Sequence, residues 1–197
     1  MFMRLLAGRI GQLLNLESLG SEVGISASTA REWISLLEAS YLIFRLPPYH
    51  ANFGKRLIKS PKIFFTDTGL ACYLLGVENI TQLQRDPMRG ALFENLMILE
   101  LIKARYNEGL DPNMFFYRDS QGKEVDLIIQ KGYELIPIEI KSSQTYNTAF
   151  LDNLRYFHSL AKERAPKSFL IYDGQPAEIQ NTSLLSWHDA AQKILQH

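Results

Sequence analysis

The sequence predicts an α/β (α+β) protein in two parts: a helical part with a small β-hairpin, then a mixed sheet flanked by helices. Three observations predict this class. Short apolar-periodic stretches joined by a glycine-containing turn occupy the first 40 residues. One long helical stretch later precedes three consecutive strand-like runs. A polar connector at 78–86 separates the two patterns, so the domain boundary is expected there.

Residues 1–80 are predicted to form a winged helix-turn-helix domain. Apolar positions recur at helical spacing in three stretches, and Ser26 or Ser28 can cap the third. Two short apolar runs then predict the strands of a hairpin, which completes the winged-helix pattern. The helices are expected at 1–14, 16–23 and 29–40, and the strands at 41–46 and 62–66. The inner face of the third helix is expected to carry Ala30, Trp33, Ile34 and Leu37.

Residues 87–197 are predicted to form the second domain. A short helix at 67–77 precedes the connector, and a long helix at 87–106 opens the domain. Strand-like and helical runs then alternate, which favours a sheet with helices packed against it. The strands are expected at 114–118, 124–130, 134–141 and 168–172, and the later helices at 150–162 and 187–195.

Charge and composition exclude several classes of protein. Lys+Arg and Asp+Glu are both 21, so the formal net charge is zero and no global basic field attracts nucleic acid. Cys72 is the single cysteine, which excludes an intramolecular disulfide and a thiolate metal cage. No run approaches the ~18 apolar residues of a membrane span, and the first residues lack a signal-peptide core. We therefore expect a cytoplasmic protein without a membrane partner.

Two strands carry a carboxylate–lysine constellation of Asp126, Glu139 and Lys141. If Gly132 and Tyr133 form the turn between the strands, Asp126 faces Glu139 directly. If Lys131 and Gly132 form it, the pairing slips by two residues. The period of two leaves Asp126, Glu139 and Lys141 on one face of the hairpin in either case.

The residue types of this constellation suit metal-dependent phosphodiester chemistry. Two converging carboxylates repel each other unless a cation lies between them, and their oxygens suit Mg²⁺ or Mn²⁺. Such a metal polarises a phosphate and lowers the pKa of its bound water. An ammonium two residues beyond Glu139 can orient the water or stabilise developing charge. The alternative is an ordinary set of solvated cross-strand ion pairs.

A third acidic group is expected from the helix at 87–106. Glu94 and Glu100 are the candidates. They lie six positions apart, about 120° around the helix, so a straight helix cannot aim both at one metal. We favour Glu94 as the assisting metal ligand.

Nucleic-acid contact is predicted from the first domain. The outward N-terminal residues of the second helix of a helix-turn-helix face the major groove, and basic residues of the wing grip phosphate. Glu32 and Glu38 weaken the basic character of that helix, so packing against a neighbouring domain is an equal alternative. The candidate DNA-binding residues are Thr29 and Arg31, with Ser28, Glu32 and Ser35 beside them, and Lys55, Arg56, Lys59 and Lys62 in the wing.

Several segments together resemble a known family. They are Leu46-Pro-Pro-Tyr-His50, Lys55-Arg-Leu-Ile-Lys59, Lys62-Ile-Phe-Phe-Thr-Asp67-Thr-Gly69, Gly90-Ala-Leu-Phe-Glu94-Asn, Tyr117-Arg118-Asp, Glu124-Val-Asp126 and Ile138-Glu139-Ile-Lys141. The chain resembles the C-terminal domain of unknown function found behind the ATPase domain of predicted prokaryotic AAA+ proteins. The resemblance implies a winged helix followed by a restriction-endonuclease-like, PD-(D/E)XK nuclease-type domain.

The resemblance also implies roles for individual residues. It places Glu94, Asp126, Glu139 and Lys141 on the nuclease-type catalytic motif. Their chemistry leads us to expect Asp126 and Glu139, assisted by Glu94, as ligands of Mg²⁺ or Mn²⁺. Arg118 and Gln144 lie near that motif.

The phosphate loop of an ATPase is missing from this chain. Gly54-Lys55 is followed by Arg56, and Gly122-Lys123 is followed by Glu124, so neither ends in the required Ser or Thr. We therefore expect no ATP site here, a fragment or split member of the family, and an ATPase domain or subunit as partner. The predicted function is a nuclease-like module that binds or cleaves nucleic acid. The alternative is a catalytically inert DNA- or protein-binding regulatory module.

Overall fold

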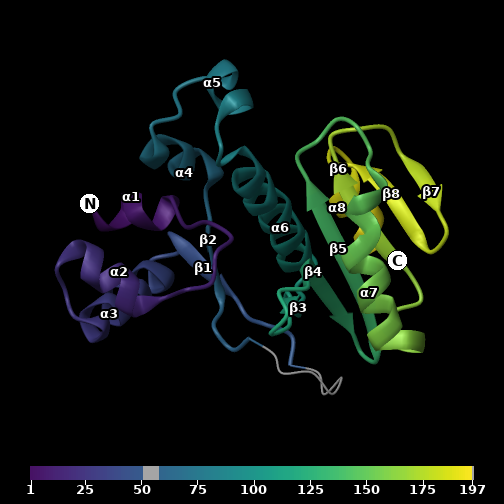
Figure 1. The fold of residues 1–197 in the computed structure, drawn as a ribbon, viewed down its shortest axis with the longest axis horizontal. Coiled ribbons are helices and arrows are strands. Elements are labelled where there is room, and N and C mark those ends of the chain that lie inside the picture. Colours follow the sequence, from purple (N-terminus) through teal and green to yellow (C-terminus); the bar gives the residue numbers. More distant parts are fainter. Residues whose placement is uncertain (51–57, 197) are drawn as a thin grey trace. The chain divides into compact units, whose positions relative to one another are not determined.

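The computed structural model of the chain describes residues 1–50 and 58–196 and divides them between two compact units (Figure 1). The N-terminal unit comprises Met1–Pro47 and Ser60–Asn95, and the C-terminal unit comprises Pro48–Lys59 and Leu96–His197. The sequence-based division into 1–80 and 87–197 differs from these units in two places. The segment between the hairpin strands belongs to the C-terminal unit, and the second boundary falls inside a helix.

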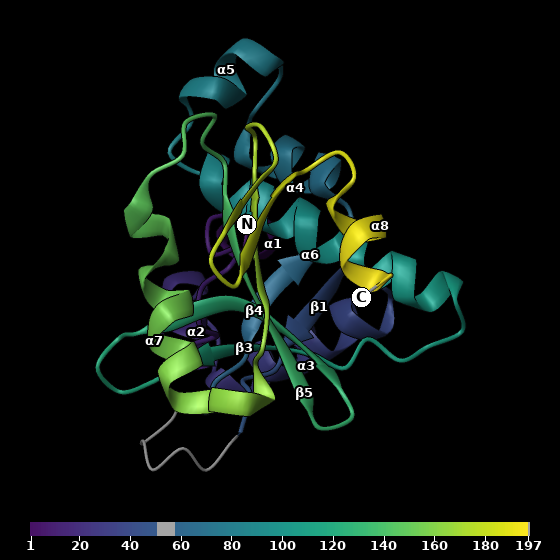
Figure 2. The same ribbon diagram turned by 90° about the vertical axis from the view of Figure 1, so that its right-hand side faces the viewer.

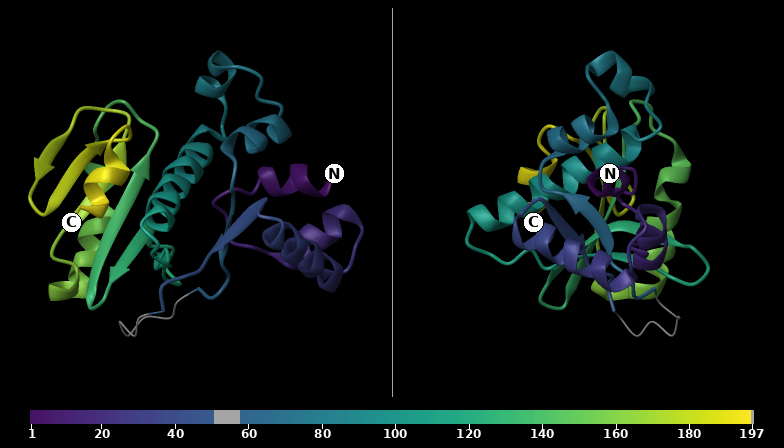
Figure 3. Two further views of the ribbon diagram at one scale, coloured as in Figure 1. Left: turned by 180° about the vertical axis from the view of Figure 1, so that it is seen from behind. Right: turned by 90° about the vertical axis from the view of Figure 1, so that its left-hand side faces the viewer.

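The N-terminal unit begins with the helices of the predicted helix-turn-helix (Figure 3). They are α1 (Phe2–Ala7), α2 (Leu16–Val23) and α3 (Ala27–Ala39). Side chains cap the last two, because Asn15 accepts from the Ser18 amide at 3.0 Å and Ser26 from the Thr29 amide at 3.1 Å. A Cβ at Gly20 would lie 2.7 Å from the Ile25 carbonyl oxygen, so only glycine permits this close approach of α2 to the turn.

The two-stranded hairpin of the unit pairs β1 (Ile43–Leu46) with β2 (Lys62–Phe65) in antiparallel register. Helix α1 ends at Ala7, although the sequence suggested a helix to residue 14. The reason is tertiary pairing: the Gly11 amide donates to Ile63 O at 2.9 Å and the Leu14 amide to Pro61 O at 2.8 Å. These bonds to the neighbourhood of β2 replace helical ones.

Helices α4 (Thr68–Leu75), α5 (Ile80–Arg85) and α6 (Arg89–Asn107) follow the hairpin. Helix α5 lies where the sequence predicted only a polar connector, and the side chain of Asn79 caps it. Asn95 of α6 is fully buried against β2. It accepts from the Phe65 amide at 2.7 Å and donates to the Phe65 carbonyl oxygen at 3.0 Å.

The C-terminal unit is a six-stranded mixed sheet in the order β3-β4-β5-β6-β8-β7. The first pairs are antiparallel, whereas β5–β6 and β6–β8 are parallel. The α/β (α+β) class with a mixed sheet flanked by helices is therefore confirmed. The strands are β3 (Met114–Arg118), β4 (Glu124–Lys131), β5 (Glu134–Lys141), β6 (Ser168–Tyr172), β7 (Ala177–Ile179) and β8 (Thr182–Ser186). The last pair, β7 and β8, was not predicted.

Helices cover both faces of this sheet. Helix α7 (Asp152–Ala161) follows the 3₁₀ turn η1 (Thr148–Leu151), precedes η2 (Lys162–Arg164), and packs on β4 and β5. The part of α6 that belongs to this unit lies across the sheet from α7 (Figures 1 and 2). Helix α8 (Ala190–Leu195) ends the described chain. Leu154 and Phe157 of α7 join Leu135 and Leu170 of the strands in one apolar cluster.

The segment before the undescribed residues completes the edge of this sheet at β3. The Tyr49 amide donates to Phe116 O at 2.7 Å, and beyond the gap the Ile58 amide donates to Arg118 O at 3.2 Å. Tyr49 is buried, packs edge-on against Phe115, and accepts a hydrogen bond from Arg164 at 2.8 Å. Residues expected at the root of a wing therefore cover the edge strand β3.

Within the described residues, no helix combines the length and the hydropathy that crossing a bilayer requires.

Replacing Asn95 with alanine is expected to lower the free energy of unfolding by about 3 kcal/mol, because it leaves the buried Phe65 amide and carbonyl without this partner. Urea denaturation measures the loss. Asn107→Ala, an exposed position at the end of the same helix, is the matched control and should change stability by less than about 0.5 kcal/mol. Equal effects of the two substitutions would contradict the bridging role of Asn95.

Candidate active site

The β4–β5 hairpin sets the register of the candidate site. Lys131 pairs with Glu134 and Leu127 with Ile138, so Gly132 and Tyr133 form the turn. This is the first of the two registers left open by the sequence. One further step along it sets Asp126 opposite Glu139. Gly132 has φ +60°, a left-handed conformation that glycine adopts without strain.

A bulge in β4 coincides with Asp126. The β3–β4 register shifts between Phe115 and Tyr117, where one residue of β3 faces two of β4. Val125 and Ile128, three positions apart, consequently both join the apolar cluster under α7. Simple alternation would have grouped Val125 with Leu127. Bulges redirect side chains, and this one occurs at the residue that the sequence singled out.

Asp126, Glu139 and Lys141 come together as predicted. The Lys141 ammonium lies 3.0 Å from Asp126 Oδ2 and 2.6 Å from Glu139 Oε2. The backbone amide of Ile140 also donates to Asp126 Oδ2 at 2.9 Å, which fixes the carboxylate against β5. The ammonium therefore bridges two carboxylates that extend from neighbouring strands.

The three groups differ in their exposure. The side chain of Glu139 is 1% exposed, that of Asp126 14% and that of Lys141 32%. Glu139 Oε1 is buried and has no hydrogen-bond partner among the described residues. A solvated cross-strand pair would leave both carboxylates in water, whereas the central strand β5 buries one of them. An unsatisfied buried carboxylate oxygen is costly and calls for an explanation.

Burial and neighbouring charges shift the pKa values of both titratable side chains that β5 contributes to the site, Glu139 and Lys141. Burial, and then the neighbouring charge of Asp126, raise the pKa of Glu139 well above its ordinary value. Burial opposes the charge of Lys141, but the charges of Asp126 and Glu139 and the hydrogen bonds to them outweigh it. The pKa of the Lys141 ammonium is therefore raised. Lys141 stays charged, and Glu139 is poised to hold either a proton or another cation.

A second polar cluster stands at the same end of the parallel strands. Asp173 directly follows β6, whose Tyr172 pairs with Lys141. Asp173 accepts from Gln144 Nε2 at 3.1 Å and from Trp187 Nε1 at 3.0 Å, and its amide donates to Ser143 O at 3.1 Å. It thus ties the segment after Lys141 to the segments that follow β6 and β8.

Sequence reasoning missed Asp173 and Trp187. Each follows a strand directly, but β8 was not predicted and the parallel order of β5, β6 and β8 was not visible. Carboxyl ends of parallel strands meet at one edge, so that order would have pointed to both residues.

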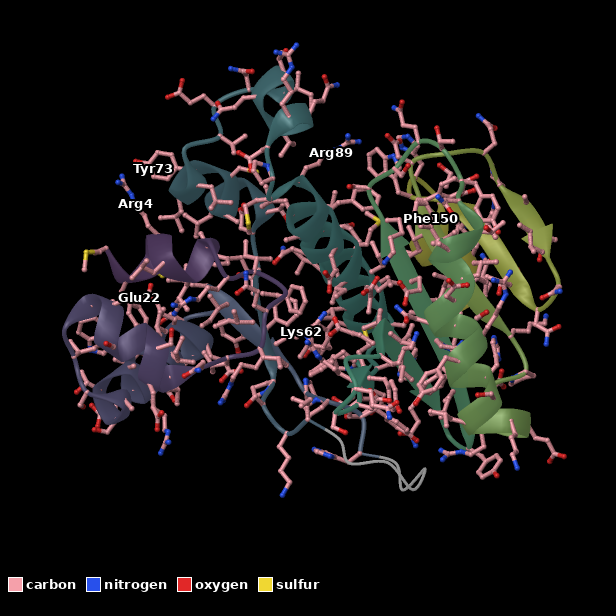
Figure 4. All side chains as sticks on the ribbon, viewed as in Figure 1. Arg4, Glu22, Lys62, Tyr73, Arg89 and Phe150 are labelled. Atoms are coloured by element: carbon pink, nitrogen blue, oxygen red, sulfur yellow. The ribbon has the colours of Figure 1, made fainter. Side chains whose placement is uncertain are left out.

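Glu94 lies in the N-terminal unit and pairs there with Lys62, with Nζ and Oε1 3.0 Å apart. Lys62 is buried on β2 and labelled in Figure 4. Its expected contact with phosphate therefore requires correction, because a buried, ion-paired ammonium does not present its charge at the surface. Glu100 forms an exposed pair with Lys103 at 2.9 Å. Arg118, expected near the motif, bonds to Glu124 at 3.0 Å.

The remaining DNA-binding candidates lie partly outside the described residues. Lys55 and Arg56 are among the undescribed residues. Lys59 is exposed, and so is Arg31 on α3. Thr29 is half-buried and its hydroxyl lies 2.9 Å from Ser26 Oγ. Within the described chain, only Arg31 and Lys59 of the predicted set present an exposed positive charge.

The donor set available for a cation is a pair of carboxylates. In the part of the chain that the structure describes, no three His, Cys, Asp or Glu side chains gather closely enough to hold a metal ion. Asp126 and Glu139 nevertheless offer hard oxygen donors, and Glu139 Oε1 is buried without a partner there. Mg²⁺ is commonly held by one or two carboxylates, with water and substrate phosphate completing its shell. The pair fits such an ion.

Two family models match the chain. Residues 1–81 match a domain of unknown function (DUF8612), and residues 89–188 match a second domain of unknown function (DUF4143). Uncharacterized proteins of Mycobacterium bovis and Mycobacterium tuberculosis are each 33% identical over 142 residues, which is 72% of this chain and 31% of theirs. An uncharacterized protein of Haemophilus influenzae is 26% identical over 155 residues, 76% of this chain and 35% of its own. The chain thus spans about a third of the length of these relatives.

The raised pKa of Glu139 predicts a pH dependence of stability. Because the folded-state pKa exceeds that of the unfolded chain, the protonated carboxyl stabilises the fold at low pH. This contribution is lost as the pH rises from the unfolded value, about 4.3, through the folded one. Glutamine does not titrate. The unfolding free energy of the wild type minus that of Glu139→Gln should therefore decrease as the pH rises, in metal-free urea denaturation. Glu100→Gln should give a nearly flat difference, and a flat difference for Glu139→Gln would contradict the burial of its charge.

Proposed function

The chain belongs to the DUF4143 family over residues 89–188, and we propose that this part of it is a metal-dependent phosphodiesterase of the nuclease type that acts on nucleic acid. One observation carries the proposal. The buried side chain of Glu139 on β5 lies opposite Asp126 on the neighbouring strand β4 and contacts the Lys141 ammonium. Its Oε1 has no hydrogen-bond partner among the described residues.

The arrangement is difficult to explain as a stabilising device. A buried ion pair seldom repays the cost of desolvating its charges, and here two negative groups share one positive group. Replacement of a buried ion pair by well-packed apolar residues is often neutral or stabilising. Strongly perturbed groups that converge at strand ends are typical of functional sites. The arrangement is therefore typical of a site that binds a cation and an anionic substrate.

Each residue has a role in this proposal. Asp126 and Glu139 would hold one Mg²⁺ or Mn²⁺, which when bound polarises a phosphate and acidifies a water molecule. Lys141 donates a hydrogen bond from its ammonium to the phosphate or to the attacking water. The Ile140 amide keeps Asp126 in place. Asp173 bonds to Gln144, three residues after Lys141, and to Trp187 after β8, which orders the segments that follow these strands.

The chain is also proposed to work with an ATPase domain or subunit. The curated relatives extend well beyond the region they share with this chain, and the sequence resembles the C-terminal part of predicted AAA+ proteins. The missing phosphate loop means that ATP would bind elsewhere than in these residues.

A second candidate is an inert DNA- or protein-binding regulatory module. The outward face of α3 favours it, because Trp33 and Leu36 are 38% and 65% exposed there. Trp33, expected on the inner face, contacts Phe2 edge-on at 5.1 Å and is partly exposed. Exposed apolar side chains on a helix expected to read DNA favour contact with protein instead.

The cleavage assay is a direct test of the first candidate. Supercoiled plasmid and single-stranded DNA are expected to be cut in Mg²⁺ or Mn²⁺ and to stay intact in EDTA. Asp126→Ala and Lys141→Ala should each lower the rate by about a hundredfold or more. Asp152→Ala, an exposed carboxylate on α7, is the control and should cut like wild type. Activity that survives Asp126→Ala and Lys141→Ala would refute the assignment of these residues.

The second candidate predicts a different result from the same protein. No divalent ion should support turnover, calorimetry should detect no Mn²⁺ binding, and binding of DNA or protein should survive Asp126→Asn. Mn²⁺ binding that Asp126→Asn abolishes would reject the inert module.

A further inference from the structure

Lys141 occupies the place between the carboxylates that a cation would take. Its ammonium lies 3.0 Å from Asp126 Oδ2 and 2.6 Å from Glu139 Oε2. A divalent ion that uses these carboxylates would meet a positive charge within contact distance. The two cations cannot share the position, because like charges this close repel strongly.

The carboxylates are held more firmly than the lysine. Glu139 is enclosed within the sheet, and Asp126 is anchored by the Ile140 amide. Lys141 has the largest exposed fraction of the three, 32%, and a flexible four-carbon stem. When charge enters between the carboxylates, the ammonium is therefore the group that moves.

We infer that Lys141 is a built-in counter-ion that competes with the metal and is released toward the substrate phosphate when a divalent cation binds. The inference rests on the proposed function. Without metal, two carboxylates and one ammonium leave a formal charge of −1. With a divalent ion the same groups carry +1, which a phosphodiester restores to zero. Lys141 thus lowers the affinity for metal alone and couples metal binding to substrate binding.

The test is calorimetric titration of the protein with Mn²⁺ at pH 8, in the absence of nucleic acid. Lys141→Met removes the charge but keeps much of the stem. It is expected to bind Mn²⁺ about tenfold more tightly than wild type or better, because a unit charge this close changes such an equilibrium by roughly one to three orders of magnitude. Lys103→Met is the matched control. Its ammonium pairs with Glu100 on the surface of α6, so the affinity should stay that of wild type.

The outcomes separate the two claims. Equal or weaker Mn²⁺ binding by folded Lys141→Met, with wild type binding normally, overturns the counter-ion role and leaves the proposed function intact. No binding by either protein rejects the metal site itself, and with it both claims. If Lys141→Met does not fold, the ammonium signal of Lys141 in ¹⁵N NMR of the wild type decides. It should shift when diamagnetic Mg²⁺ is added, and an unchanged signal at saturating Mg²⁺ overturns the inference.

Discussion

The enclosure of the Glu139 carboxylate in the centre of a sheet is the constraint on which the candidate site depends. Strand β5 is hydrogen-bonded on both sides and covered on both faces, so its side chains cannot reach water easily. A carboxylate there needs positive charge or a proton. Lys141 on the same strand pairs with Glu139, and Asp126 on the neighbouring strand shares that ammonium. The geometry of the site, the raised pKa of Glu139 and the fit of the two carboxylates to a cation all follow from that one placement.

The sequence was sufficient to predict the centre of the site. A two-residue turn and the period of two brought Asp126, Glu139 and Lys141 together without any knowledge of the remaining fold. Local pattern also located the helices of the N-terminal unit except α5, and four strands of the sheet, because each is defined by neighbours in sequence. The bulge at Asp126 could not be predicted, since it depends on how many residues of β3 face β4.

Long-range partners account for what the sequence left out. Helical spacing could not show that Glu94 pairs with Lys62, because that contact joins it to a strand 32 residues away, and the expected role of Glu94 as a metal ligand stays a prediction. Charge alone suggested that Lys62 is exposed, whereas it lies on a buried strand. Residues 48–50 were expected in the loop between the hairpin strands. Instead, the Tyr49 amide donates to the Phe116 carbonyl oxygen of the edge strand β3. The short strands β7 and β8 depend on pairing with β6, and Asp173 and Trp187 become neighbours only through that parallel order.

The most direct measurement of the central claim is a crystal structure of the protein soaked in Mn²⁺, with anomalous differences used to locate the metal. We expect a single strong peak at the carboxylates of Glu139 and Asp126, with the Lys141 ammonium displaced from its position between them. A map without a peak at these carboxylates, with Lys141 still bridging them at saturating Mn²⁺, would contradict it.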